Sequence, residues 1–183
     1  MGMTSNVVWH TTMSLDGFIA GPNHTMDWVF EYPASPDAMK IMQLTGAMLA
    51  GRNTYDVGVR DTGKESGAPY GGAWSGPVFV LTHRRPTGVQ DPSITFLDGD
   101  IRQAVATASA AAGDKNLEVL GANVARQCIE AGLLYEIVIH LTPILLGDGV
   151  HLFERLNAEP VHLERVSVDQ SSQVTAFRFR VLE

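Results

Sequence analysis

The sequence predicts an α/β domain in which a mixed, mostly parallel sheet lies between two layers of helices. Val-, Ile- and Leu-rich runs of strand length alternate with segments whose apolar residues recur at helical spacing. Residues 77–82 form a continuous apolar run, which is typical of a strand buried on both faces. The chain ends in two alternating segments around a short polar turn, so we expect a three-layer α/β/α arrangement that closes with an antiparallel hairpin.

The first part of the chain is expected to contribute two strands and the helix that joins them. Residues 6–11 form the first expected strand, and residues 47–50 form a short buried second strand. Between them, Ser35, Pro36 and Asp37 precede apolar residues at helical spacing. A hydroxyl cap followed by proline and an acidic residue favours helix initiation, so a helix is expected to begin there.

The remaining chain is expected to alternate strands with helices before the hairpin. Helical spacing covers residues 101–108 and 124–131, and the two helices are expected to end near Gly113 and Gly132. From Tyr135 onward apolar and polar residues alternate, which predicts a strand with one buried face. The expected strands of this part are residues 77–82, 94–97, 116–120, 135–142, 161–168 and 174–181.

A glycine-rich segment at residues 58–76 is predicted to be a long loop. Loops of this length within compact domains are usually lids over a site or disordered segments. The sequence leaves both alternatives open.

Composition limits the class of protein. A chain of 183 residues, 45% of them hydrophobic, suits one domain over residues 1–183. The net charge of −7 disfavours nucleic acid as a partner, and the single cysteine, Cys128, fits a reducing compartment. The histidines are not spaced with carboxylates as metal ligands are, so no metal is expected. Without an apolar leader or span, we expect a cytoplasmic protein that does not enter membranes.

Two segments have the pattern of a phosphate site at the start of a helix. In the first, an apolar strand leads into Gly51, Arg52, Asn53 and Thr54, and the second has a similar strand, turn and helix start at residues 121–124. Backbone N–H groups at a helix N-terminus bind phosphate, and ligands of open α/β sheets collect at the carboxyl ends of strands. A structural turn with a solvated arginine and a threonine cap is the alternative explanation of the first segment.

Three further features are candidates for the site. Arg84 and Arg85 follow the strand at 77–82 and suit the extra phosphate that distinguishes NADPH from NADH, although a solvated turn also explains them. Residues 13–21 form a loop that can pack over a flat ring, or a simple Asp-Gly turn. Asp27 lies among apolar and aromatic residues, where a carboxyl group can relay a proton or cap a helix.

Taken together, these segments resemble the dihydrofolate reductase-like superfamily. The resemblance is strongest to the reductase domain of the riboflavin-biosynthesis deaminase-reductase and its stand-alone homologues. It covers nearly the whole chain, and its specificity comes from the order and spacing of residues 14–20, 51–55, 78–82, 120–133 and 143–149. It implies a dihydrofolate reductase-like fold, NADPH as cofactor, and a homodimer.

The resemblance also implies roles for individual residues. Residues 14–20 are expected to cover the nicotinamide, residues 81–84 to bracket the adenosine ribose, and residues 121–125 to meet the pyrophosphate. The residues assigned to the cofactor are Ala20, Gly51, Arg52, Asn53, Thr54, Leu81, Thr82, His83, Arg84, Gly121, Ala122, Asn123, Val124 and Ala125. Ser14, Asp16 and Trp28 are assigned to the substrate, and Asp27 is assigned the catalytic role of orienting the substrate or supplying a proton.

The function implied is NADPH-dependent reduction of a small pyrimidine- or pterin-like molecule, of which 5-amino-6-(5-phosphoribosylamino)uracil is one candidate. Two departures from the family pattern are visible: Ala122 stands where a second glycine is frequent, and the sequence has no zinc-deaminase motif. A non-catalytic nucleotide-binding homologue and a true dihydrofolate reductase are the alternatives.

Overall fold

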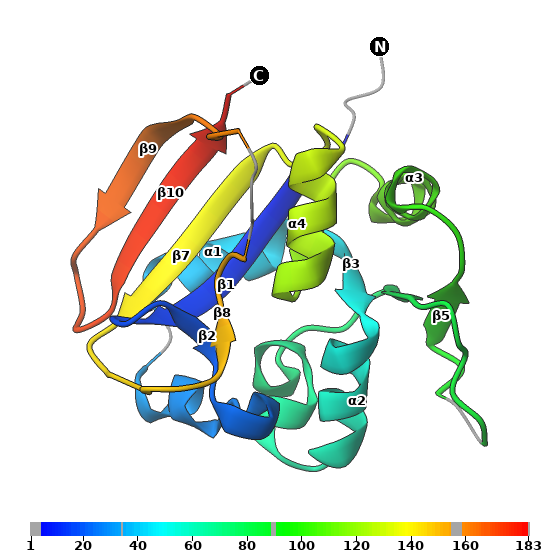
Figure 1. Cartoon of the computed structure of the whole chain (residues 1–183), viewed down its shortest axis with the longest axis horizontal. Coiled ribbons are helices and arrows are strands. Elements are labelled where there is room, and N and C mark those ends of the chain that lie inside the picture. Colours follow the sequence, from blue (N-terminus) through cyan, green and yellow to red (C-terminus); the bar gives the residue numbers. More distant parts are fainter. Residues whose placement is uncertain (1–4, 34, 89–90, 155–158, 183) are drawn as a thin grey trace.

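The computed structural model describes residues 5–33, 35–88, 91–154 and 159–182. Figure 1 shows a twisted sheet with helices on both faces, as expected from the sequence. The strands are β1 (Val7–Ser14), β2 (Phe18–Ala20), β3 (Thr45–Gly51), β4 (Val78–Leu81), β5 (Ile94–Leu97), β6 (Asn116–Leu120), β7 (Glu136–Thr142), β8 (Val150–His151), β9 (Leu163–Asp169) and β10 (Thr175–Val181). The helices are α1 (Pro36–Leu44), α2 (Arg52–Arg60), α3 (Ile101–Ala112) and α4 (Ala122–Glu130), and 3-10 turns occur at η1 (Pro22–His24), η2 (Asp27–Glu31), η3 (Glu65–Gly67) and η4 (Pro69–Gly72).

The main sheet has eight strands in the order β5-β4-β3-β6-β1-β7-β10-β9. The strands from β5 to β7 in this order are parallel, and β10 and β9 add the expected antiparallel hairpin. The chain passes from β1 to β3 and β4, then returns to place β6 between β3 and β1. The carboxyl ends of β3, β4 and β6 therefore lie side by side, where open α/β sheets bind their ligands.

The two faces of the sheet pack against different helices. On one face, Trp9, Leu49 and Leu117 belong to a large apolar core that includes buried residues of α3 and α4. On the other face, Val8 and Val138 pack against Ile41 of α1. Because side chains alternate along a strand, His10, Glu118 and His140 share this second face.

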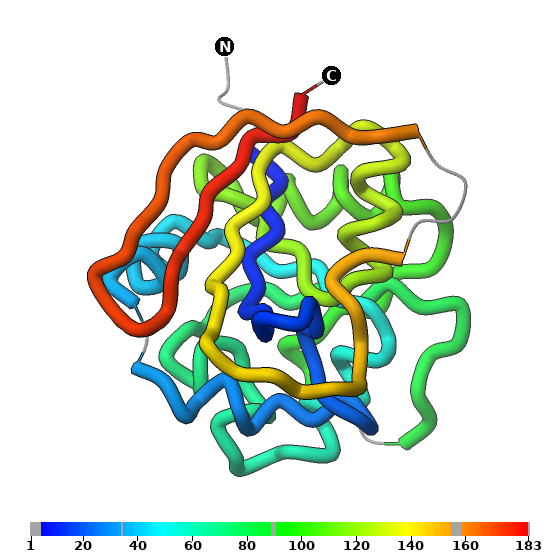
Figure 2. Tube along the Cα trace, turned by 60° about the vertical axis from the view of Figure 1, so that its left-hand side comes forward, coloured from blue at the N-terminus to red at the C-terminus, as the bar shows by residue number. Residues whose placement is uncertain are grey.

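A small second sheet, which the sequence analysis did not predict, pairs β2 with β8. Figure 2 shows the segment after β7 curving beside the turn between β1 and β2. Leu15 N–H donates to the Ile144 carbonyl at 2.9 Å, and Leu152 N–H donates to the Gly17 carbonyl at 2.9 Å. The loop expected at 13–21 is thus a turn at Asp16 and Gly17 followed by a strand.

Two further expectations need correction. The polar residues His140 and Thr142 of β7 are 4% and 1% exposed, so this strand is buried on both faces instead of one. Residues 58–76 are not one continuous loop, because α2 extends to Arg60 and the turns η3 and η4 follow. In the described part of the chain, no helix is both long and apolar enough to cross a membrane.

Candidate functional site

A cleft of about 1410 Å³ opens at the carboxyl ends of β3, β4 and β6. It brings together Arg52, Thr54 and Gly121, which the sequence analysis had placed in one site. The other predicted cofactor residues that line the cleft are Ala20, Gly51, Asn53, Leu81, Thr82, His83, Arg84, Ala122, Asn123 and Val124. Ala125 is the exception, since its side chain is fully buried in the core beneath α4.

The helices α2 and α4 both point their N-termini into this cleft. Their N-cap residues are Gly51 and Gly121, neither helix has a side-chain cap, and neither has an acidic residue in its first turn. The first N–H groups of a helix have no partner within the helix, and they carry partial positive charge. The two N-termini therefore suit the phosphate groups of a dinucleotide.

The turns at the two N-termini are in close contact. Gly121 has a φ of +90°, a left-handed conformation that side chains disfavour, and a Cβ atom there would lie 2.8 Å from Thr54 Oγ1. A Cβ atom at Gly51 would lie 3.3 Å from Val124 Cγ2. Ala122 is not among the residues of positive φ, so its backbone conformation does not require the glycine frequent in the family. The absence of a side chain at 121 leaves room for a ligand to approach the backbone.

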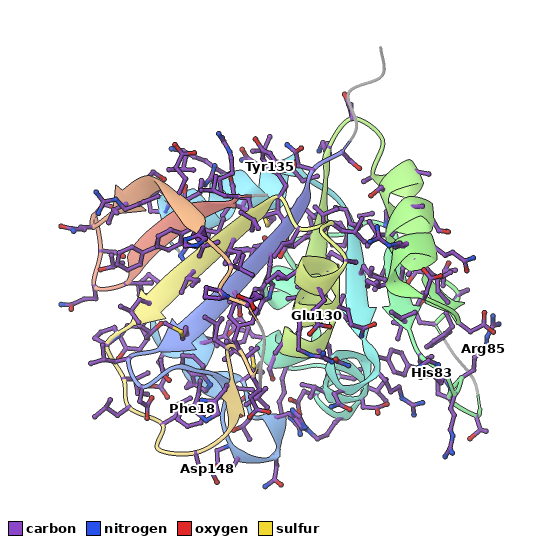
Figure 3. The ribbon with its side chains drawn as sticks, turned by 45° about the horizontal axis from the view of Figure 1, so that its top comes forward. Phe18, His83, Arg85, Glu130, Tyr135 and Asp148 are labelled. Carbon is purple, nitrogen blue, oxygen red and sulfur yellow. The ribbon has the colours of Figure 1, made fainter. Side chains whose placement is uncertain are left out.

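Basic side chains lie at the outer part of the cleft. Arg52 Nη1 donates to the Arg84 carbonyl at 2.7 Å, and Arg52 Nε donates to both carboxylate oxygens of Asp56, at 2.8 and 2.9 Å. These bonds link α2 to the segment after β4 and place one guanidinium beside the cleft. Figure 3 shows His83 and Arg85 on that segment at the periphery of the molecule. Arg85 donates to the Phe96 carbonyl at 3.3 Å.

Ser14 and Asp16, which were assigned to the substrate, fasten the turn between β1 and β2. Ser14 Oγ donates to Asp16 Oδ1 at 2.6 Å and accepts from Phe18 N–H at 3.0 Å. Asp16 also accepts from the N–H groups of Leu146 and Gly147, at 3.1 and 2.7 Å. The Ser14 hydroxyl and these N–H groups lower the pKa of Asp16 to about 2. Neither side chain lines the cleft, and their contact with a substrate stays a prediction.

Asp27 and Trp28 also lie outside the residues that line the cleft. Asp27 begins η2, is exposed, and accepts a hydrogen bond from Ser66 Oγ at 3.1 Å. The expected apolar setting of this carboxyl is therefore wrong, because the neighbouring indole of Trp28 turns into the protein, where it is 6% exposed. The catalytic role of Asp27 stays a prediction, and the exposed setting removes the reason for it.

A polar cluster that the sequence analysis did not find reaches the same cleft. His10 on β1, Glu118 on β6 and Tyr70 on η4 all line it. Tyr70 Oη donates to Glu118 Oε2 at 2.8 Å and lies 2.7 Å from His10 Nδ1, and Thr45 Oγ1 lies 2.7 Å from Glu118 Oε2. His10 is 60 residues from Tyr70 along the chain, and Glu118 is 48 from it. The order of β1 and β6 in the sheet and the path of the segment that carries η4 bring the three together, so residue spacing carries no signal of this cluster.

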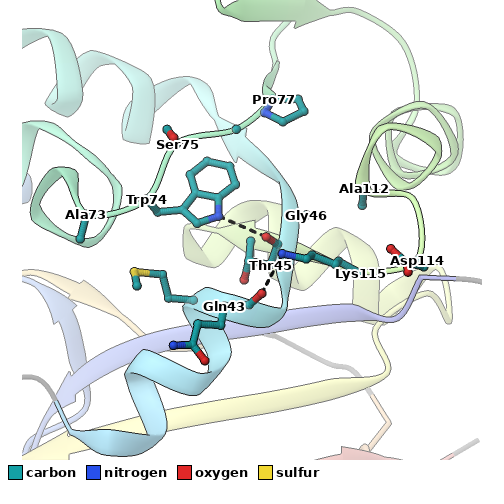
Figure 4. Close-up of a pocket in the computed structure, with 12 residues that line it drawn as sticks. Gln43, Thr45, Gly46, Ala73, Trp74, Ser75, Pro77, Ala112, Asp114 and Lys115 are labelled. Carbon is teal, nitrogen blue, oxygen red and sulfur yellow. Dashed lines mark hydrogen bonds between the residues drawn. The ribbon is translucent and has the colours of Figure 1, made fainter.

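A second hollow, of about 540 Å³, lies at the opposite end of β3 (Figure 4). Trp74 Nε1 donates to the Thr45 carbonyl at 3.2 Å, and Lys115 Nζ donates to the Gln43 carbonyl at 2.9 Å. These side chains are engaged with backbone carbonyls and close the end of the sheet. The hollow is thus part of the scaffold, and the cleft at the helix N-termini remains the candidate site.

The sheet order and the position of the cleft define a dihydrofolate reductase-like protein. Comparison with known families then identifies the chain: the model of the RibD C-terminal domain matches residues 5–177, so the chain belongs to that family. This is the reductase-like part of the riboflavin-biosynthesis proteins. A curated relative, the uncharacterised protein YwjB of Bacillus subtilis (strain 168), is 26% identical over 160 residues, which are 86% of this chain and 87% of the relative.

Solved structures support the fold. A protein from Shewanella sp. PV-4, named for a supposed role in riboflavin biosynthesis, has a TM-score of 0.80 at 23% identity, with 97% of this chain and 99% of that chain covered. A pyrimidine reductase-like protein from Corynebacterium diphtheriae has a TM-score of 0.66 at 13% identity, with coverage of 98% and 92%. The deaminase/reductase of Thermotoga maritima has a TM-score of 0.67 at 15% identity, and this chain covers 57% of it.

Proposed function

We propose that the protein is an NADPH-dependent reductase of a small pyrimidine- or pterin-like molecule, acting in the cytoplasm. One observation carries the proposal: the uncapped N-termini of α2 and α4 meet in a cleft that is lined by nearly all the residues assigned to the cofactor. Membership of the RibD C-terminal domain family supports a nicotinamide cofactor. The donor set fits such a group, because it offers free N–H groups, a hydroxyl and guanidinium groups.

Each part of the cleft has a role in this proposal. The N–H groups at the start of α4 and those of α2, the latter with Arg52 and Thr54, hold the pyrophosphate between them. In the proposal Arg84, which also lines the cleft, pairs with the phosphate that distinguishes NADPH from NADH. When bound, the cofactor supplies a hydride to a carbon of a C=N or C=O group. The protein's share of the work is to position the two reactants and to exclude water between them.

The proposed substrate class is supported by the name of one solved relative. The Thermotoga protein is named a 5-amino-6-(5-phosphoribosylamino)uracil reductase as well as a deaminase. This chain covers 57% of that protein and has no zinc-deaminase motif, so we propose the reductase step alone. The uracil compound is accordingly the first substrate to assay, and dihydrofolate is the second.

The proposal is tested by titrating the purified protein with NADPH and NADH while following energy transfer from the tryptophans to the bound dihydronicotinamide. We expect saturable binding that prefers NADPH. In Arg52→Ala the dissociation constant should rise about tenfold or more, because a charge-assisted hydrogen bond contributes about 1.5–3 kcal/mol. Arg102→Ala is the matched control, since this arginine is exposed on α3 and lies outside the residues that line the cleft. Binding of neither nucleotide would refute the proposal.

A homodimer is part of the proposal. The strand β9 forms one edge of the main sheet, and Leu163 and Val166 on it are each 43% exposed. Exposed edges with apolar side chains favour pairing with another chain. Light scattering on a sizing column measures the oligomeric state directly. The expected mass is twice the 19.8 kDa of one chain, and the mass of a single chain would refute the proposed homodimer.

A further inference from the structure

The cluster of His10, Tyr70 and Glu118 is not used by the proposed cofactor site, although it lines the same cleft. Glu118 is 2% exposed and lies on β6, in the middle of the sheet. Burying a carboxylate is costly unless it is paired and hydrogen-bonded. The backbone of Tyr70 also has a φ of +52°, an uncommon conformation for a residue with a side chain, and such strain is concentrated at functional sites. Both observations indicate that the cluster has a function of its own.

The hydrogen bonds determine where the protons of the cluster lie. The Tyr70 hydroxyl has one proton and donates it to Glu118. Burial and the Glu118 carboxylate raise the pKa of Tyr70, so the hydroxyl keeps this proton. Its oxygen must then accept from its other neighbour, the His10 Nδ1 atom at 2.7 Å. Nδ1 of His10 therefore carries a proton.

The second nitrogen of the His10 ring remains available to a ligand. Among the described residues, the structure gives His10 Nε2 no hydrogen-bond partner, and the ring lines the cleft. Because Nδ1 is held as a donor, Nε2 carries a proton only in the imidazolium form. A carboxylate oxygen of Glu118 lies 3.5 Å from His10 Nδ1, within the distance of an ion pair with a protonated ring.

The imidazole ring of His140, which lies beside His10, does not take up the positive charge in place of His10. His140 on β7 packs edge to face against His10, with ring centroids 4.7 Å apart. Burial, and secondarily the proximity of His10, lowers the pKa of His140 to about 3, so His140 stays neutral. Glu118 is the one acidic side chain among the ionisable groups that the structure describes around His10, and the other two are Tyr70 and His140.

We propose that His10 is the acid of the reduction, with Tyr70 and Glu118 as the positioning residues that hold its ring with Nε2 toward the substrate. This inference rests on the proposed function. If the bound cofactor supplied a hydride to the carbon of a C=N or C=O group, the π electrons would move to the heteroatom. That atom takes the proton from Nε2, which leaves neutral His10 protonated at Nδ1. Solvent returns a proton to Nε2 after the product leaves the cleft.

The first test measures the tautomer by nuclear magnetic resonance of protein labelled with ¹⁵N in histidine, without substrate. The neutral His10 ring is expected to carry its proton on Nδ1. In Tyr70→Phe, which removes only the hydroxyl, the proton is expected to move to Nε2 in part or entirely, whereas a merely structural tyrosine would leave the tautomer unchanged. A wild-type ring protonated at Nε2 overturns the inference and leaves the cofactor site untouched.

The second test measures kcat and KM with 5-amino-6-(5-phosphoribosylamino)uracil and with dihydrofolate. Loss of a general acid lowers rates by roughly 10²–10⁴-fold, so His10→Gln should lower kcat about 100-fold while the NADPH dissociation constant changes less than twofold. His162→Gln, an exposed histidine outside the cleft, is the matched control. A kcat retained within threefold in His10→Gln overturns the inference, and a simultaneous loss in Asp27→Asn would return the role to Asp27.

The two tests separate failure of this inference from failure of the proposed function. If the wild-type protein binds NADPH but reduces neither compound, the inference and the reductase step are both overturned while the cofactor site stands. If it does not bind NADPH, the proposed function fails at its first step, whatever the tautomer of His10.

Discussion

The helices of this protein begin in two different ways. The N-terminus of α1 is capped by Ser35 Oγ, which accepts from Ala38 N–H at 3.1 Å, and that of α3 by Asp100, which accepts from Gln103 N–H at 2.9 Å. The helices α2 and α4 begin at Gly51 and Gly121 and have no side-chain cap. Only the uncapped pair lines the cleft.

The difference shows that the free N–H groups at a helix N-terminus can serve either the stability of the helix or the binding of a ligand. A side-chain cap satisfies one free N–H group and stabilises a helix by about 1 kcal/mol. An N-terminus without a cap gives up that stabilisation and keeps its N–H groups and positive potential for an anionic ligand. The capped helices therefore belong to the scaffold, and the uncapped ones to the site. The following changes test that division, in order of decreasing effect.

The largest effect is expected for Gly121→Val. A side chain at a φ of +90° is strained by about 1–2 kcal/mol, and its Cβ would lie only 2.8 Å from Thr54 Oγ1, which would have to move away. We expect the free energy of unfolding to fall by about that amount and the NADPH dissociation constant to rise at least tenfold. Gly113→Val is the matched control, because it has a φ of +67° at the end of α3 and nothing within 4 Å. It should lose stability in chemical denaturation without losing affinity.

An acidic residue in the first turn of α2 should separate stability from binding. Asn53→Asp changes little in shape, and a carboxylate near a helix N-terminus stabilises the helix by about 0.3–1 kcal/mol. The same charge repels a phosphate, so NADPH affinity should fall about fivefold to tenfold while the melting temperature rises. Calorimetry and the fluorescence titration measure the two effects, and a simultaneous loss of both would contradict the division.

Removing a cap from the scaffold should have the opposite pattern. Asp100→Ala exposes the start of α3 and should lower the free energy of unfolding by about 1 kcal/mol. Because α3 does not meet the phosphates in our proposal, the NADPH dissociation constant should remain within experimental error. Urea denaturation and the same titration provide the measurement, and weakened binding would show that α3 also serves the site.

The smallest effect on stability near neutral pH is expected for His140→Gln, a change beside the N-terminal cap of α1. Ser35 Oγ lies 3.3 Å from Nδ1 of His140, whose pKa is about 3 in the folded protein, below the ordinary 6.5. The unfolded chain therefore binds the proton more readily between these values, so the free energy of unfolding falls as pH drops from about 6.5 toward 3 and is at its full value above 6.5. In His140→Gln this part of the acid dependence should disappear from denaturation curves. An unchanged pH profile would show that His140 does not contribute.

Much of the fold could be predicted from local pattern. The strands at 94–97 and 116–120 agree with β5 and β6, and the helix start at Ser35 is confirmed by its hydrogen bond. The sequence did not reveal the β2–β8 pair, because strands of three and two residues carry too little periodicity. It also misjudged β7, since the alternation of polar residues does not show that a second layer buries them.

For the candidate site, the sequence by itself determined which segments have the pattern of a phosphate site. Glycine before a helix, with arginine and threonine beside it, is a local pattern, because the N–H groups and the residues around them are close along the chain. The tertiary structure alone decided which polar groups share the cleft. In the folded chain Asp27 is exposed, and Ser14 and Asp16 hydrogen-bond within a turn. The fold also brings His10, Tyr70 and Glu118 into contact. The reason is physical: strand order, strand register and the paths of the connecting turns set these distances, and the spacing of residues along the chain specifies none of them.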